Sequence, residues 1–247
     1  MANINSTVED RYLQHLHQIE KLIEYAFDIF GQISGKVAQT DREYYGEIIF
    51  RKATAHAISL RNILPTGLIP KKPNSQEIWD ISTACGISRS IIEAFDMLFF
   101  TAIEDIETDE REFRLIYTNL HGVNQTLEMS DTMKSTNQNI NFYTSKRNEL
   151  HNEIIKHPFF RKIDKKTKSD IKKLKFRPFY IPQKIRNERA GINHNYYQAA
   201  KMFLSSHTHT HPFSINQISK FKAGDEDSLR LISAPLQYSI SFYCKTL

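Results

Sequence analysis

Apolar side chains recur every three or four positions along the first third of the chain, the spacing that places them on one face of an α-helix. The first such run consists of Val8, Tyr12, Leu16, Ile19, Ile23, Ala26, Phe27 and Phe30. Residues 6–9 (Ser-Thr-Val-Glu) have the pattern of a capping box, so we expect a long helix to begin there. The pattern predicts a second helix from Asp41 to Leu64, which Pro65 ends.

Three more helices are expected before residue 157. The loop 66–73 contains two prolines and one glycine, and Asn74 or Ser75 can cap a third helix that reaches about Ile106. Several acidic side chains follow residue 108, and the positive end of a helix dipole, at its N-terminus, stabilises negative charge. The sequence therefore predicts a fourth helix over 108–129. A fifth helix is expected over 141–156, after a polar stretch and before a proline.

Beyond residue 158, prolines and glycines divide the chain into short pieces. Brief helices are expected near 167–175 and 194–206, and a last one over 228–243. Few windows alternate as strands do, so the sequence predicts an all-α fold in a single domain. We expect an antiparallel helical bundle over about 6–157 and an irregular basic C-terminal lobe, with the last helices, over about 158–247.

The composition narrows the class of protein. Hydrophobic residues make up 40% and charged residues 25%, which is typical of globular proteins, and eight glycines are few for a turn-rich β-fold. Cys85 and Cys244 lie far apart, so they form the pattern of neither a disulfide framework nor a zinc ribbon. The apolar run 87–106 carries five charged residues, and the first residues lack a signal-peptide pattern. We therefore expect a cytoplasmic protein with no membrane partner.

Positive charge changes this picture, because it is concentrated in one segment. Residues 146–189 contain fifteen Lys or Arg and five Asp or Glu, a net charge of +10, whereas the whole chain has +5. The rest of the chain therefore has a net charge of about −5. One basic surface on an otherwise acidic protein predicts a polyanionic partner, and nucleic acid, RNA above all, is the first candidate.

Aromatic residues lie between these cations. Aromatic rings can stack on unpaired bases while Lys and Arg neutralise phosphates, so the mixture suits single-stranded nucleic acid. The alternative is that the aromatics pack this lobe against the bundle while the lysines are solvated. The aromatics concerned are Phe159, Phe160, Phe176, Phe179 and Tyr180. The expected nucleic-acid-binding residues are Arg161, Lys162, Lys165, Lys166, Lys172, Lys173 and Arg177.

Arg147 and His151 form a candidate catalytic pair at the edge of the basic segment. They are four positions apart, which places both side chains on one helix face. In this hypothesis His151 acts as a general acid or base on RNA and Arg147 stabilises phosphate charge. The alternative is an exposed helix face with ordinary polar residues.

The histidines of Ser205-Ser-His-Thr-His-Thr-His-Pro212 form a second candidate site. If this segment is extended, His207, His209 and His211 share a face and could bind a metal, which would suit a metal-dependent hydrolase. The alternative is a loop after a helix, with one histidine packed and two exposed. His207 is also a candidate general acid or base that needs no metal or other cofactor.

Arg89 and Glu93 lie four positions apart in the most apolar predicted helix. Charges in a core helix need partners, so this pair is either a buried ion pair or the lining of a pocket. A buried ion pair would hold this helix in register, whereas a pocket lining would make both residues candidate catalytic groups.

Arg89-Ser-Ile-Ile-Glu93 and the later segment Leu204-Ser-Ser-His together resemble a group of poorly characterised bacterial helical proteins, which are grouped loosely with abortive-infection and HEPN-like proteins. The resemblance covers about residues 40–215. It implies that Arg89, Glu93 and one of His207 or His209 meet in a pocket between bundle helices. In HEPN ribonucleases four to six residues separate an Arg from a following His, and two such motifs usually meet at a dimer interface. Only three residues separate Arg147 from His151, one short of this motif.

These observations lead to three functional predictions. The first is a bacterial defence or toxin-type protein that acts on RNA, with a metal-independent ribonuclease activity that uses Arg and His pairs. The second is a binding or regulatory protein without catalysis, for which the basic lobe suffices. The third is the metal-dependent hydrolase. A homodimer and a complex with a partner protein are both compatible with the first two.

Overall fold

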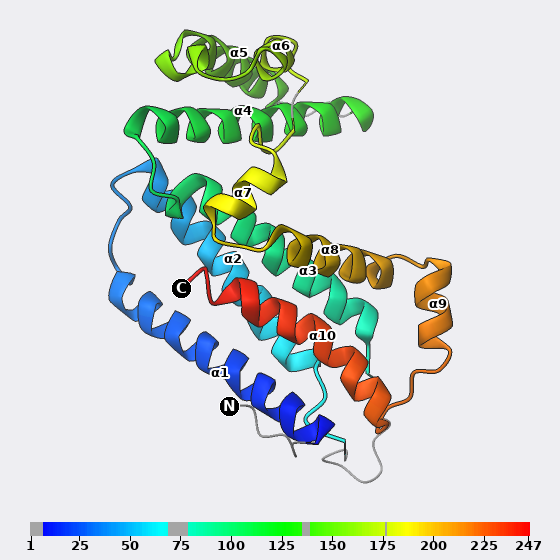
Figure 1. Ribbon diagram of the computed structural model, residues 1–247. Coiled ribbons are helices and arrows are strands. Elements are labelled where there is room, and N and C mark those ends of the chain that lie inside the picture. The colour runs from blue at the N-terminus through cyan, green and yellow to red at the C-terminus, as the bar shows by residue number, and fades with distance from the viewer. Residues whose placement is uncertain (1–6, 69–78, 135–138, 176) are drawn as a thin grey trace. The chain divides into compact units, whose positions relative to one another are not determined.

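A computed structural model shows an all-α protein, as the apolar periodicity predicts (Figure 1). The structure describes residues 7–68, 79–134, 139–175 and 177–247, and these ranges contain helices and no strand. The chain divides into two compact units. Unit 1 comprises Met1–Phe99 and Gly191–Leu247, and unit 2 comprises Phe100–Ala190. None of the helices in the described part of the chain combines the length and apolar character that a membrane span requires.

Unit 1 is a helical bundle in which the C-terminal helix lies among the N-terminal ones. Helix α10 contacts α1, α2 and α3, runs parallel to α3, and has α2 antiparallel to both (Figure 1). Helix α8 packs on α3 and contacts α9. The helices of this unit are α1 (Val8–Ile33), α2 (Asp41–Ile63), α3 (Ile81–Leu98), α8 (His194–Thr208), α9 (Pro212–Ile218) and α10 (Glu226–Tyr243).

Side-chain caps explain where the first helices begin. A capping box starts α1, but it joins Thr7 to Asp10, one residue later than the expected box at 6–9, whose first residue lies outside the described ranges. Helix α3 begins after Asp80, whose carboxylate accepts a hydrogen bond from the Thr83 amide at 2.9 Å. The expected caps at Asn74 and Ser75 lie outside the described residues, and the helix that the structure describes, α3, begins at Ile81.

The third helix also ends earlier than the expected Ile106. Helix α3 stops at Leu98 and is followed by a π-helical turn, η1 (Phe99–Ile103). The Arg111 guanidinium donates to the carbonyl oxygens of Ala102, Glu104 and Ile106, and it thereby satisfies backbone acceptors that no longer have a helical partner. An arginine beyond the helix therefore stabilises this irregular end.

Unit 2 is built around α4 and α5, which pack on each other. The short helix η2 contacts both of them, and α6 contacts α5. The elements are α4 (Thr108–Thr132), α5 (Ile140–Lys156), η2 (Pro158–Arg161), α6 (Lys165–Lys172) and α7 (Gln183–Arg189). Their shared core consists of Phe113, Tyr117, Leu120, Leu150, Ile154, Phe160, Ile163 and Ile171.

The division into units differs from the expected boundary near residue 157. Helices α4 and α5, which we expected in the N-terminal bundle, share a core with the basic segment, because Phe113 and Tyr117 pack with Phe160 and Ile171. Helices α8, α9 and α10, expected beside the basic lobe, belong to unit 1. The basic segment is therefore part of a compact helical unit with its own apolar core.

Candidate nucleic-acid interface

Helix α6 carries part of the basic segment, and local contacts fix both of its ends. Asp164 caps its first turn by accepting hydrogen bonds from the Thr167 amide, at 2.9 Å, and the Thr167 hydroxyl, and these bonds lower the pKa of Asp164. Leu174 adopts a left-handed conformation with φ of 54°, and the Lys175 amide then donates to the Asp170 carbonyl at 2.9 Å. Only Ile171 of this helix is buried, so its lysines are left at the surface.

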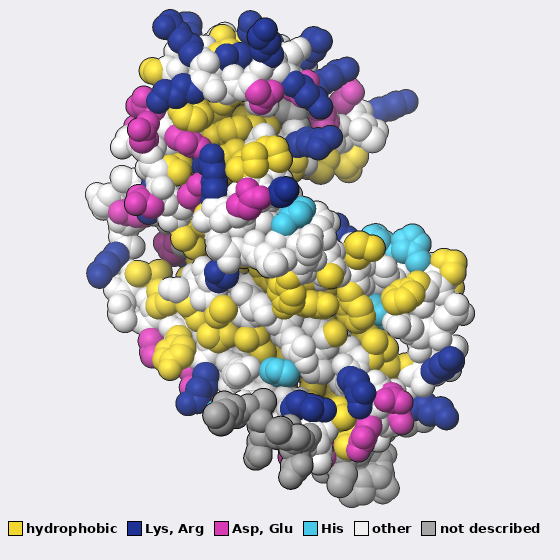
Figure 2. All heavy atoms as spheres, in the orientation of Figure 1, with side chains coloured by type: hydrophobic (Ala, Val, Ile, Leu, Met, Phe, Trp, Pro, Cys, Tyr) yellow, Lys and Arg dark blue, Asp and Glu magenta, His cyan; other side chains and the backbone are white. Residues whose placement is uncertain are grey.

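All seven residues that the sequence analysis selected for phosphate contact have exposed side chains. Of these seven, Lys162 has partners: its Nζ lies 3.4 Å from a Glu107 carboxylate oxygen and over the ring of Phe159. The other six form no ion pair or side-chain hydrogen bond within the described residues: Arg161, Lys165, Lys166, Lys172, Lys173 and Arg177. In Figure 2, Lys and Arg side chains gather over α5 and α6.

The interleaved aromatics of unit 2 serve packing first. Phe160 is buried in the core and Phe159 packs against it, with its ring 5.3 Å from that of Phe113. Phe179 lies edge-on to Phe100 at 5.2 Å. These contacts fit the alternative in which aromatics hold the basic segment against neighbouring helices, whereas Phe176 lies outside the described residues. Phe159, Phe179 and Tyr180 are partly exposed, and the Arg186 guanidinium lies over the Phe179 ring at 3.8 Å.

A pocket of about 800 Å³ lies within unit 2, where α6 and the segment before α7 face α4. Its aromatic and apolar lining includes Tyr117, Phe179, Tyr180 and Ile181, and two prolines flank the last three of these. Its charged lining consists of Lys166, Lys175, Arg177 and Arg186 together with Asp164 and Asp170. Four cations and two carboxylates make this pocket net positive, so it suits an anionic ligand with an apolar portion.

Hydrogen bonds hold the pocket wall in place. The Tyr117 hydroxyl donates to the Arg177 carbonyl oxygen at 2.6 Å. Arg186 is buried, with its guanidinium carbon 3.8 Å from the centre of the Phe179 ring, and it donates to the Ile181 carbonyl at 2.7 Å. Burial raises the pKa of both Tyr117 and Tyr180, so both stay neutral.

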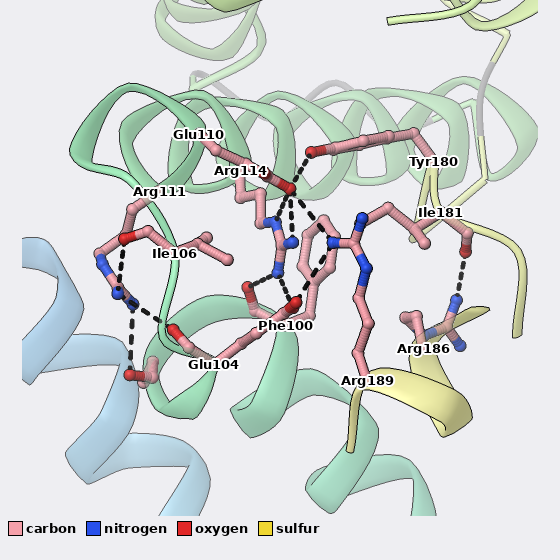
Figure 3. A network of polar contacts seen from close by, with 11 residues as sticks. Phe100, Glu104, Ile106, Glu110, Arg111, Arg114, Tyr180, Ile181, Arg186 and Arg189 are labelled. Carbon is pink, nitrogen blue, oxygen red and sulfur yellow. Dashed lines mark hydrogen bonds and ion pairs between the residues drawn. The ribbon is translucent and has the colours of Figure 1, made fainter. Parts of the chain in front are cut away.

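A buried ion network lies beside this wall and uses part of the basic segment (Figure 3). Arg114 is fully buried and its guanidinium contacts Glu104 at 2.6 Å and Glu110 at 2.5 Å. It also donates to the Phe100 carbonyl at 3.1 Å. Arg189 joins the same carboxylates, at 3.2 Å from Glu104 and 3.6 Å from Glu110. Arg189 is therefore matched by carboxylates and not available to a ligand.

The expected pair Arg147 and His151 lies on α5, and neither residue lines this pocket. The Nε2 atom of His151 is 3.1 Å from the Ile171 carbonyl oxygen, and since a carbonyl only accepts, this nitrogen must carry the proton. Arg147 lines a separate groove of about 330 Å³ that also contains Glu128 and Asp131. The structure thus gives His151 a role in holding α6 on α5.

Unit 1 contains Arg89, Glu93 and His207, but their surroundings differ. Arg89 and Glu93 form an ion pair at 2.9 Å with side chains 33% and 50% exposed, so the expectation of a buried pair is wrong. The buried acid of α3 is instead Asp96, which accepts a hydrogen bond from the Tyr197 hydroxyl. Among the described residues, no hydrogen bond or ion pair joins Arg89 or Glu93 to His207.

The three clustered histidines also differ in how far they are buried. His207 is buried in the last turn of α8, with its ring 4.7 Å from Phe203 and 5.8 Å from Phe213, whereas His209 and His211 are exposed. Because His207 is helical, the extended segment on which the metal hypothesis depends is not formed. No group of three His, Cys, Asp or Glu suited to a metal ion occurs in the described part of the chain.

The sequence analysis did not select Lys175, Phe179 and Arg186 as one site. A signal for them exists, because Pro178 and Pro182 bracket an aromatic-apolar tripeptide between cations, which is typical of an extended segment. Its packing against Tyr117 could not be read from local spacing, since Tyr117 is 60 residues from Arg177.

Comparison with known proteins adds no assignment. No protein-family model, no curated protein and no solved structure matches this chain. The resemblance to HEPN-like proteins therefore stays a prediction. The functional proposal rests on the charges and contacts of unit 2.

Proposed function

We propose that this protein binds nucleic acid through unit 2, with RNA as the first candidate. The proposed function is binding alone and does not include a catalytic step. One observation carries this proposal: seven exposed cations from Arg161 to Arg177, Lys175 among them, have no carboxylate or side-chain hydrogen-bond partner among the described residues. Surface lysines that only keep a protein soluble are usually interspersed with acids. Here the unpaired cations follow one short segment, which suits a repeating phosphate backbone.

Affinity for RNA should depend steeply on salt. If all seven cations contact phosphates of a single strand, the logarithm of the binding constant falls with a slope of about −5 against the logarithm of salt concentration. Fluorescence anisotropy with a labelled RNA of mixed sequence, measured over a series of salt concentrations, gives this slope. A slope near zero would contradict the proposal, because binding would then not release counterions.

A matched pair of variants separates a specific surface from net charge. Lys172→Glu/Lys173→Glu reverses two exposed cations at the end of α6. Lys21→Glu/Lys36→Glu makes the same charge change at exposed positions of unit 1. We expect the first variant to weaken RNA binding by at least about tenfold and the second to leave it nearly unchanged. Equal losses in both variants would show that only the overall charge matters.

RNA cleavage is a separate prediction and is measured separately. His151, on the neighbouring helix α5, is the predicted acid or base, and its Nε2 proton is engaged by the Ile171 carbonyl. Incubation of total RNA with the protein and with Arg147→Ala/His151→Ala tests the ribonuclease prediction. Intact RNA in both samples leaves the binding proposal unchanged.

A further inference from the structure

We infer that the pocket of unit 2 accepts one unpaired nucleotide of a bound strand, so that the protein prefers single-stranded over double-stranded nucleic acid. This inference rests on the proposed function and adds to it the kind of strand that is bound. The occupant is a nucleotide with its phosphate at the cations of the pocket and its base against the aromatic wall.

The size and lining of the pocket suit such an occupant. A volume of about 800 Å³ lies within the range of small-ligand pockets and exceeds what a lone phosphate requires. The partly exposed parts of Phe179 and Tyr180 line the pocket, and the prolines at 178 and 182 add apolar wall. A base paired inside a duplex cannot enter such a pocket, whereas an unstacked base of a single strand can.

Three cations at the pocket are available for a phosphate. The side chains of Lys166, Lys175 and Arg177 make no ion pair or hydrogen bond within the described residues, and all three are exposed. Of the two carboxylates in the lining, Asp164 is engaged by Thr167 in the helix cap. Asp170 remains as the opposing charge in the lining, against these three cations.

The neutral hydrogen-bonding groups of the lining are already engaged within the protein. The Tyr117 hydroxyl donates to Arg177, and the Tyr180 hydroxyl donates to Glu110. The Gln183 amide accepts from Arg186 through its oxygen and donates to Asn187 at 2.8 Å. Because these groups are not free to read a base edge, we expect selection for an unpaired nucleotide with little preference among bases.

The test compares one labelled RNA strand with the same strand annealed to its complement. The pocket variant is Lys175→Gln/Arg177→Gln. Its control is Lys165→Gln/Lys172→Gln, which removes the same charge from exposed positions that do not line the pocket. We expect the wild-type protein to bind the single strand more tightly, the pocket variant to lose this preference, and the control to weaken both complexes by a similar factor.

Competition identifies what the pocket holds. Unlabelled 5′-AMP and 5′-UMP should displace the labelled strand from the wild-type protein at lower concentrations than inorganic phosphate, and to similar extents as each other. Equal displacement by nucleotides and phosphate would overturn the inference, because the pocket would then hold a phosphate alone.

The outcomes separate the two proposals. Equal binding of single and double strands, or a pocket variant that keeps the single-strand preference, overturns the pocket assignment but leaves nucleic-acid binding intact. No binding of either RNA by the wild-type protein overturns both. Thermal melting followed by circular dichroism verifies that the variants, all at exposed positions, are folded.

Discussion

At the scale of single residues, partners in the fold decide which charged and polar groups remain available. Arg189 and Lys172 are both exposed cations of the same segment, yet Arg189 lies 3.2 Å from Glu104 while Lys172 has no such partner among the described residues. His151 likewise combines a general-base side chain with a hydrogen bond to the Ile171 carbonyl. Residue type and spacing alone do not distinguish these cases.

Replacement of His151 tests its structural role. His151→Ala removes one hydrogen bond to the Ile171 carbonyl, which still accepts from the Leu174 amide at 3.0 Å, so we expect the free energy of unfolding to fall by about 1 kcal/mol. Chemical denaturation measures this loss, and His17→Ala, at a side chain 66% exposed, is the control. RNA affinity of the folded variant should be unchanged. A fall in RNA cleavage at unchanged stability would instead support a catalytic His151.

Much of the residue-level site could be predicted for a simple reason. Helix α6 buries only Ile171, so the helical period leaves its lysines outside, and the seven selected cations are indeed exposed. The pocket could not be predicted in the same way. It needs Tyr117 of α4 to bond the carbonyl of Arg177, a contact between residues 60 positions apart that no local pattern encodes.

At the scale of elements, a buried ion network joins the start of α4 to α7. Arg114 lies between Glu104 and Glu110, and Arg189 reaches both carboxylates from the end of α7 (Figure 3). A fully buried arginine needs such partners, because an uncompensated buried charge costs several kcal/mol. The network therefore closes the two ends of unit 2 on each other.

Removal of the central cation should destabilise unit 2 strongly. Arg114→Met leaves the partly exposed Arg189 as the one cation paired with Glu104 and Glu110 among the described residues, and we expect a loss of about 3–5 kcal/mol in the free energy of unfolding. The triple variant Arg114→Met/Glu104→Gln/Glu110→Gln removes the charges together and should recover a large part of that loss. Denaturant titration measures both variants. No recovery in the triple variant would show that geometry, and not charge balance, matters.

Helix α8 carries a pH-dependent contribution to stability. Burial lowers the pKa of His207, and Gln217 beside it offsets part of this effect. The unfolded chain then binds protons more readily than the folded one, so stability is fully present above a pH of about 6.5 and falls as the pH drops below it. Burial also lowers the pKa of His15, His56 and His121, so they act in the same direction.

Substitution of His207 should therefore flatten the pH dependence of unfolding. We expect His207→Leu to lose less stability than the wild-type protein between neutral pH and pH about 5, with the remaining slope due to the partly buried His15, His56 and His121. His209→Leu, at an exposed position, is the control and should keep the wild-type slope. Denaturant titrations at several pH values measure these slopes. Parallel slopes in all three proteins would show that His207 is not protonated on unfolding.

At the scale of the whole molecule, the fold class followed from the sequence but the division of the chain did not. Apolar residues at helical spacing run through most of the chain, which predicted an all-α protein. The partners of each helix depend on contacts far apart in sequence, as when Ser239 of α10 donates to Ser88 of α3. The C-terminal helix thereby returns to the N-terminal bundle, and the basic segment joins α4 and α5 in unit 2.

This division also places the charge. Phe100–Ala190 contains eighteen Lys or Arg and thirteen Asp or Glu, a net charge of +5, while the residues assigned to unit 1 contain fifteen of each. The expectation of an acidic body beside a basic lobe is thus replaced by a neutral unit and a basic one. Long-range attraction of a polyanion acts on the unit with net charge.

Hydrogen exchange should report this asymmetry directly. On addition of RNA, we expect slower amide exchange in peptides from unit 2, above all those covering α6 and the residues from 177 to 186, because bound strand restricts local opening there. Peptides from α1 and α2 of unit 1 should exchange at unchanged rates. Mass spectrometry with the Lys172→Glu/Lys173→Glu variant as control measures both effects. Equal protection of the two units would mean that the neutral unit also contacts the strand, and the interface would then have to extend beyond the cations of α6.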